Sequence, residues 1–170
     1  FTFDQPANED GQTALAIEDA IVLGLTQVKI VAEWKGFMFY ANVIMEGETY
    51  KYRLLWSDFN DPLSITPLPE SAASYIDLPA DEEILALAPI GSSFRAYTNR
   101  AIYDIRLIGG EDIFAAPEVY RGPHALAFEN SLINLGDSHL WATQSDLVVM
   151  GEFDRWPKDA PWLTAAAGAI

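Results

Sequence analysis

From Val28 onward, the sequence alternates short runs of β-branched and aromatic residues with tight-turn residues, and this pattern constrains the fold more than any other feature. In the clearest run, Tyr50, Tyr52 and Leu54 alternate with two basic residues. A period of two residues sends alternate side chains to opposite faces of a strand. Turn residues such as Gly36 separate the runs. The pattern therefore predicts an all-β fold of antiparallel strands.

The expected strands fall into three units that begin near Val28, Ile84 and Ala125, which are 56 and 41 residues apart. Four-stranded propeller blades recur at roughly 40 to 50 residues, so the spacing fits β-propeller-like blades. It fits a β-sandwich or barrel with uneven loops equally well. The strands expected are 28–33, 37–44, 50–56, 84–88, 94–98, 101–108, 125–128, 132–135, 139–143 and 147–150, with a loop over 57–80.

The same pattern divides the chain into three segments. Residues 1–27 are acidic and weakly patterned, 28–155 hold the β-rich units, and 156–170 contain Pro161 and an Ala-rich run that favours a helix. Three units are too few to close a propeller, which usually has four to eight blades. The first residue is Phe rather than Met. We therefore expect a fragment of a longer propeller, a part that neighbouring chains complete, or a different β fold.

Composition and charge exclude several classes of protein. The 170 residues include 25 acidic and 10 basic side chains, which gives a net charge of −15, and no Cys. Without Cys, a disulfide scaffold, a zinc–thiolate site and a cysteine nucleophile are excluded. The negative charge opposes specific binding to nucleic acid or anionic lipid, which needs clustered Lys and Arg. No apolar run is long enough for a membrane span.

One loop motif superficially suggests a calcium site. Asp58, Asn60 and Asp61 bring three oxygen-bearing side chains close together, but Pro62 stands where a calcium loop would continue. We expect Asp58 and Asn60 to accept backbone N–H groups and so fold the loop, with Pro62 fixing its exit.

The remaining candidate motifs also have structural interpretations. His124 and His139 are 15 residues apart without a carboxylate at helical spacing, so they predict no zincin-type site. His139 lies in an expected strand on the same face as Trp141, which predicts a packed or surface histidine. Two acidic residues follow the Gly109-Gly110 pair and would repel phosphate. The sequence thus predicts no catalytic, cofactor-binding or metal-binding residues, and no enzymatic activity.

Much of the chain resembles structural proteins of tailed bacteriophages. The matching motifs, in chain order, are Leu54–Pro62 (LLWSDFNDP), Ile65–Pro67, Ile84–Gly91, Phe94–Ile105, Gly109-Gly110, Phe114, Gly122–Ala125, His139–Thr143 and Asp146-Leu147. The resemblance covers roughly residues 28–155, and it departs at Ile65, where the family usually has a second Trp.

The resemblance implies a β-propeller in the virion tail, as in nozzle, hub or DNA-stabilisation proteins. The implied partners are other tail or portal-adaptor proteins, in a homo-oligomeric ring around the DNA passage. Acidic groups lining such a passage would let DNA slide past without specific binding, because like charges repel. The same charge would also keep a virion protein soluble before assembly.

A carbohydrate-binding, hydrolytic or receptor-binding β-domain is the alternative, and an extracellular or periplasmic adaptor is a third reading. Exposed Trp beside acids in a groove would favour sugar binding, whereas buried Trp would favour a structural role. The five tryptophans are Trp34, Trp56, Trp141, Trp156 and Trp162.

Overall fold

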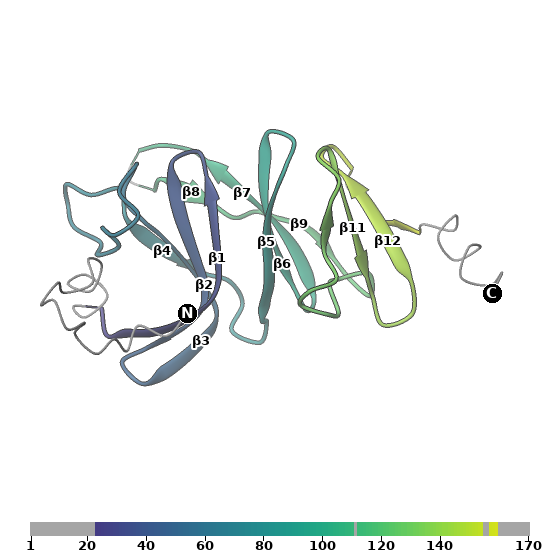
Figure 1. Ribbon diagram of the computed structural model, residues 1–170, viewed down its shortest axis with the longest axis horizontal. Coiled ribbons are helices and arrows are strands. Elements are labelled where there is room, and N and C mark those ends of the chain that lie inside the picture. Colours follow the sequence, from purple (N-terminus) through teal and green to yellow (C-terminus); the bar gives the residue numbers. More distant parts are fainter. Residues whose placement is uncertain (1–22, 111, 155–156, 160–170) are drawn as a thin grey trace, which may run out of the picture. The chain divides into compact units, whose positions relative to one another are not determined.

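The computed structural model describes residues 23–110, 112–154 and 157–159, which form strands and connecting loops (Figure 1). The predicted all-β fold is confirmed: the described strands make three antiparallel sheets, and none of these closes into a barrel. No helix in the described part of the chain is long and apolar enough to cross a membrane. The chain divides into two compact units, 1–83 and 84–170, and each is described by itself.

The first unit holds one sheet whose strands follow chain order. Its strands are β1 (Leu25–Trp34), β2 (Phe37–Met45), β3 (Glu48–Trp56) and β4 (Ser74–Asp77). Lys35-Gly36 and Glu46-Gly47 form the first two turns, and all four residues have positive φ angles. Two-residue hairpins need this geometry because it matches the twist of the strands. Local turn chemistry therefore fixes the register of β1, β2 and β3.

The second unit holds the other two sheets. The second sheet contains β5 (Ile84–Ile90), β6 (Ser93–Thr98), β7 (Ala101–Leu107), β8 (Phe114–Ala115) and β9 (Glu118–Arg121). The third sheet contains β10 (Ile133–Asn134), β11 (Ser138–Ala142), β12 (Leu147–Gly151) and β13 (Lys158–Asp159). Both β8 and β9 pair with β7, and otherwise each strand neighbours the next in sequence. Sequential four-stranded order is also that of a propeller blade.

Several strand boundaries differ from the sequence prediction. β1 begins at Leu25 rather than Val28, and β4 lies inside the expected 57–80 loop. β4 pairs with the end of β3, and its Asp77 accepts two hydrogen bonds of 2.7 Å from Arg53. The strand expected over 84–88 is longer, because β5 continues through Pro89 to Ile90. β5 is at the end of its sheet, where a residue without an N–H group is tolerated.

The strand predicted over 125–128 is also wrong. The Ala125 N–H donates to the Gly122 carbonyl in a turn, while the Leu126 side chain is fully buried. A buried apolar loop produces the same short hydrophobic run as a strand. Within 132–135, only Ile133 and Asn134 form a strand. The helix expected in 156–170 and most of segment 1–27 lie outside the described residues.

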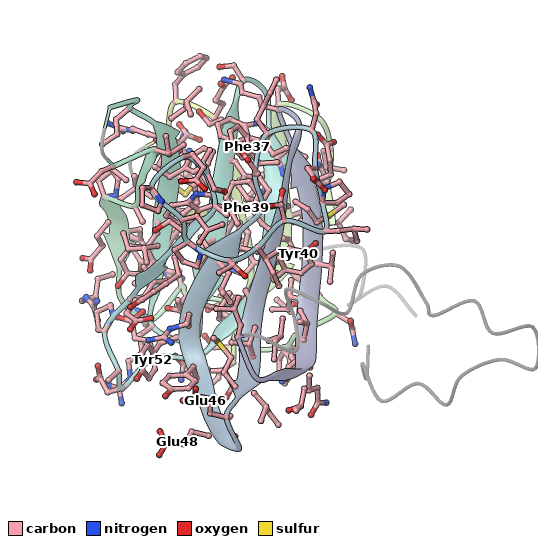
Figure 2. All side chains as sticks on the ribbon, turned by 90° about the vertical axis from the view of Figure 1, so that its left-hand side faces the viewer. Phe37, Phe39, Tyr40, Glu46, Glu48 and Tyr52 are labelled. Atoms are coloured by element: carbon pink, nitrogen blue, oxygen red, sulfur yellow. The ribbon has the colours of Figure 1, made fainter. Side chains whose placement is uncertain are left out.

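The core of the first unit lies against one face of its sheet. β1, β2, β3 and the following loop supply its buried members, which are Leu25, Val28, Tyr40, Val43, Met45, Leu55 and Ile65. Figure 2 shows Phe37, Phe39 and Tyr40 of β2 within the mass of side chains, whereas Glu46 and Glu48 lie at the tip of the next hairpin. The apolar strand centres and charged turn thus follow the expected pattern.

A β-bulge in β2 introduces a buried polar link. Asn42 has a φ of 54°, and the pairing of β2 with β3 shifts register at this residue. Its amide donates to Glu83 Oε1 at 3.1 Å, and Lys29 and Lys51 form ion pairs with the same carboxylate. These contacts connect β1, β2 and β3 to Glu83, the last residue of the unit. Burial raises the pKa of Glu83, but the hydrogen bonds and the lysine charges outweigh this effect, so the pKa is lowered.

In the second unit, the second and third sheets pack face to face. Their shared core consists of Tyr97, Ile102, Tyr120, Leu126, Trp141, Val148 and Met150. The ring centroids of Tyr97 and Trp141 are 5.3 Å apart in an edge-on arrangement. Aromatic pairs at this separation add to the free energy gained by burial. The interface between these two sheets is therefore a closely packed core.

A chain of hydrogen bonds crosses this interface. The Tyr97 hydroxyl lies 2.6 Å from His139 Nδ1, and His139 Nε2 lies 2.8 Å from the Pro89 carbonyl oxygen. A carbonyl can only accept, so Nε2 carries a proton. Burial lowers the pKa of His139 and so favours the neutral ring, in which Nδ1 accepts from the Tyr97 hydroxyl. The hydrogen bond to the Pro89 carbonyl opposes this shift of the pKa, and the charge of Arg95 adds to it.

We predict that this histidine makes stability depend on pH. The folded state resists protonation of His139, whereas in the unfolded chain its imidazole gains a proton as pH falls below about 6.5. The stabilising effect is therefore present above that pH, and stability should decrease from pH 6.5 to 5.5 by at most about 1 kcal/mol. Urea denaturation of the wild type and of His139→Gln measures the change.

His139→Gln should be less stable at neutral pH but nearly constant across this window. His124→Gln is the matched control and should keep the wild-type pH dependence. Equal wild-type stability at both pH values would contradict the prediction.

Candidate functional site

The loop that suggested calcium is held together by its own backbone. Asp58 Oδ1 accepts hydrogen bonds from the N–H groups of Phe59 and Ala72, at 2.7 and 3.1 Å. This confirms the structural role predicted for Asp58. The prediction for Asn60 differs: its backbone N–H donates to Gly36 at 2.7 Å and its φ is 55°, a conformation that Asn tolerates. The Tyr40 hydroxyl donates to the carbonyl of Pro62.

The histidines do not come together. His139 is buried between the sheets, and the backbone N–H of His124 donates to the Tyr120 hydroxyl at 3.1 Å. Within the described ranges, no three His, Asp or Glu side chains are grouped as metal ligands.

The tryptophans that the structure describes are buried. Trp34, Trp56 and Trp141 have exposed fractions of 8%, 3% and 0%. Trp56 Nε1 donates to the Ala72 carbonyl, and Trp141 Nε1 donates to the His124 carbonyl. These three residues therefore follow the structural pattern rather than forming a sugar platform. Trp156 and Trp162 lie outside the described residues.

The strongest candidate site is a pocket of about 580 Å³ in the second unit. β6, β7 and β9 form its walls, and the turn 152–154 contributes a further side. Its charged lining residues are Arg95, Asp104, Arg106, Glu118, Glu152 and Asp154.

Strand alternation explains why charged groups gather at this place. On β6, Tyr97 and Arg95 point to the same face of the sheet. On β7, their cross-strand partners Ile102 and Asp104 point to that face as well. Tyr97 and Ile102 belong to the core between the sheets. Two residues away from these on each strand, Arg95 and Asp104 are direct cross-strand partners. The pocket therefore begins where the apolar part of this face ends.

Arg95 and Asp104 are only partly satisfied by the protein. Arg95 has an exposed fraction of 2%, and its terminal nitrogens donate to the carbonyls of Gly151 and Glu152. Asp104 is 8% exposed, and its Oδ2 accepts from Arg106 Nε at 2.8 Å. Among the described residues, Arg95 Nε and Asp104 Oδ1 have no hydrogen-bond partner. Both atoms are themselves buried, so the pocket does not present them to solvent.

The turn beside the pocket is fixed at both of its acidic residues. Glu152 Oε1 accepts from the Ser92 N–H at 2.8 Å and from the Ser92 hydroxyl, and these bonds lower the pKa of Glu152. Asp154 accepts from Lys158 Nζ at 2.7 Å and from the Gly151 N–H at 3.0 Å, which lowers its pKa as well. Both side chains therefore stay ionised near neutral pH.

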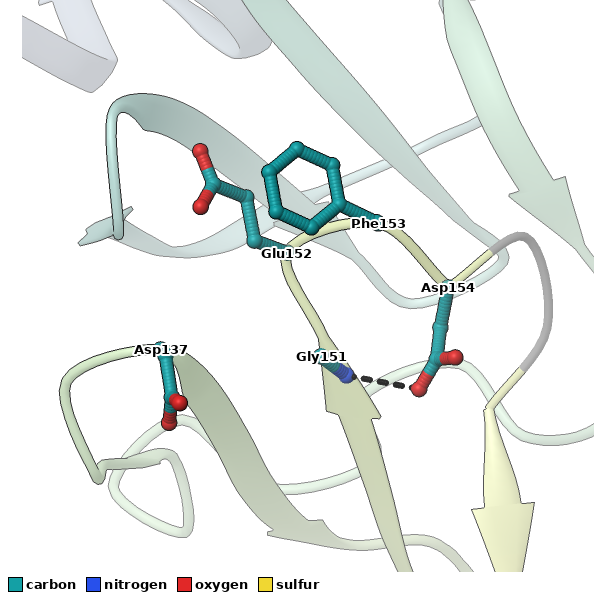
Figure 3. Close-up of a pocket in the computed structure, with 5 residues that line it drawn as sticks. All are labelled: Asp137, Gly151, Glu152, Phe153 and Asp154. Atoms are coloured by element: carbon teal, nitrogen blue, oxygen red, sulfur yellow. Dashed lines mark hydrogen bonds between the residues drawn. The ribbon is translucent and has the colours of Figure 1, made fainter.

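Phe153 lies between these two anchors and is 90% exposed. Figure 3 shows Phe153 and Glu152 projecting to one side of the turn, while Asp154 folds back to Gly151. A smaller hollow of about 230 Å³, which also reaches Asp137, shares this turn with the larger pocket. The turn presents an exposed aromatic ring between two carboxylates.

None of these pocket residues is among the candidates predicted from the sequence. Arg95 and Asp104 did leave a signal, because each is a charged residue in the middle of an apolar strand. Such residues are rarely buried without a partner. No comparable signal marks Glu152, Phe153 and Asp154, whose position depends on contacts with β6 and its preceding turn.

We predict that Gly91→Ala releases Glu152 from its anchor. A Cβ atom at Gly91 would lie 2.0 Å from Glu152 Oε2, so the carboxylate has to move. Gly109→Ala is the matched control, because Gly109 also has positive φ but no atom within 4 Å of the added Cβ. Both variants carry the left-handed backbone cost of about 1–2 kcal/mol.

Gly91→Ala should lower Tm further than Gly109→Ala, and only Gly91→Ala should raise the pKa of Glu152 toward its ordinary value. Thermal unfolding and an NMR titration of the carboxylates measure both effects. An unchanged Glu152 titration in Gly91→Ala would refute the contact.

Two comparisons with known proteins add no family to these observations. No model of a known protein family matches the chain. A search of curated proteins finds no match either. The resemblance to phage tail proteins therefore rests on the sequence motifs given above.

Proposed function

We propose that the chain is a structural, non-catalytic component of a phage virion tail, assembled with other tail proteins around the DNA passage. The observation that carries the proposal is the succession of three antiparallel sheets, of which two have four strands in chain order and one has five. Blades of this kind are stabilised by stacking on their neighbours. The resemblance of the sequence motifs to phage structural proteins is the reason for assigning the chain to a virion tail.

Two further features support a role in assembly. In the second unit, two successive sheets already pack face to face through a shared aromatic core, as successive blades do. Near the first strand of the third sheet, Phe128, Ile133 and Leu135 are 56%, 51% and 51% exposed. Exposed apolar groups of this size are common where proteins contact one another. A ring of identical chains or a neighbouring tail protein would cover them.

We predict that the chain is a constituent of particles. Cells that carry its gene are induced or infected, and the released particles are purified by density gradient. Peptide mass spectrometry should find the chain in the particle fraction at a fixed ratio to the other tail proteins. Its confinement to the soluble cell lysate would overturn the proposal.

We also predict that the purified chain does not bind DNA. Its net charge of −15 repels phosphates, and binding to DNA depends on Lys and Arg releasing counterions. Fluorescence anisotropy of a labelled duplex should stay constant on addition of the protein, even at about 50 mM salt, where such binding is strong. Saturable binding that weakens with added salt would contradict passive passage.

A further inference from the structure

The third sheet has two apolar faces, and the second sheet covers only one of them. Trp141, Val148 and Met150 belong to the core between these two sheets. Side chains alternate along a strand, so Leu140 and Val149, which are direct cross-strand partners, point to the opposite face. We call the face that carries Leu140 and Val149 the outer face.

The pairing of the strands assigns the other members of the outer face, because direct cross-strand partners share a face. They are Ile133, Ser138, Ala142, Leu147, Gly151 and Lys158. None of them is acidic, and Ile133 is 51% exposed. The charged member, Lys158, forms an ion pair of 2.7 Å with Asp154. The outer face is therefore an apolar surface whose one charge is already paired.

An apolar outer face is unusual for a sheet that water covers. An antiparallel sheet with one solvated face normally alternates apolar and polar residues. β12 instead contains the continuous apolar run 147–150 (LVVM), which is typical of a strand covered on both faces. β6 of the second sheet shows that outcome, because its Phe94 and Tyr97 point to opposite faces and both are fully buried. The run in β12 thus indicates that a further layer packs on the outer face.

The properties of the outer face favour a second copy of the chain as this layer. The third sheet already packs on one sheet through an apolar face, and two sheets pack well through faces of this kind. The outer face of a second copy is such a surface. Contact between identical patches gives a closed two-fold dimer, which is the commonest oligomer.

The distribution of charge also permits this contact. With a net charge of −15, two copies of the chain repel each other. The outer face brings no carboxylates of the two copies directly together, because it has none. Exposed Asp137 and Asp146 directly precede β11 and β12, at the margin of the sheet. Salt screens the repulsion between such exposed charges, so association through the outer face should strengthen as salt is added.

We propose that two copies of the chain associate through the outer faces of their third sheets, related by a two-fold axis. The contact buries Ile133, Leu140 and Val149 of both copies. The proposal goes beyond the structural role proposed above, because it names the face and its partner. It holds whether or not the chain belongs to a particle.

The size of the face sets the expected affinity. β11 and β12 have five residues each, and four strands about 4.8 Å apart make a face of roughly 14 by 17 Å. Two such faces bury less than the roughly 1,200 Å² of a standard complex, so the dimer should be weak, with a Kd on the order of 100 µM.

Sedimentation of the full chain tests the proposal, at concentrations from roughly tenfold below to tenfold above this Kd. The chain should change from monomer to dimer over this range and should not form larger species. Added salt should lower the Kd, because the contact is apolar and its margin is acidic.

Ile133→Asp should weaken the dimer at least about tenfold, since it places a charge in the apolar contact of both copies. Ile133 is exposed, so this variant should fold, and circular dichroism checks that it does. Ile108→Asp is the matched control. Ile108 is 56% exposed in the same unit but lies outside the third sheet, so the same change of charge should leave the Kd of the dimer unchanged.

Three results would overturn the proposal. A chain that stays monomeric at every concentration would mean that residues 160–170 or another protein cover the outer face. A dimer that Ile133→Asp and Ile108→Asp affect equally would place the contact elsewhere. Association that continues beyond two copies would exclude the closed two-fold contact. None of these results bears on whether the chain is found in particles, so the two proposals fail separately.

Discussion

The hydrogen bond between the Tyr97 hydroxyl and His139 is the constraint on which the second unit depends. Both side chains are completely buried, and each would be destabilising there without the other. A shift of β11 by one residue would turn His139 to the opposite face. The Tyr97 hydroxyl would then lose its acceptor and the Pro89 carbonyl its donor. The same shift would move the buried Trp141 out of the core, so the polar chain and the apolar packing favour one register.

This register also creates the pocket. Arg95 is two residues from Tyr97 on the same face of β6, so it points toward the third sheet at the margin of the core. Its guanidinium reaches the carbonyls of Gly151 and Glu152. The turn is held a second time where Glu152 accepts from Ser92. Packing of the sheets and placement of the pocket wall are thus parts of one arrangement.

The fold could be predicted from sequence wherever the information is local. The Lys35-Gly36 and Glu46-Gly47 turns have their own chemistry, and the strands beside them were found nearly to their ends. β4 was missed because a strand of four residues is defined by its pairing with β3, 18 or more residues away in sequence. The run 125–128 was misread because burial of Leu126 gives no information about its backbone.

The candidate site was harder to predict, and the reason is physical. A charge within an apolar strand, such as Arg95 or Asp104, shows that something must satisfy it, but not what. Two nitrogens of Arg95 donate to the carbonyls of Gly151 and Glu152, which are distant in sequence. One oxygen of Asp104 accepts from Arg106. A further polar atom of each side chain has no hydrogen-bond partner among the described residues. Both of these atoms are themselves buried. Which groups satisfy such a charge is therefore decided by strands and turns that are distant in sequence, and a local pattern does not record them.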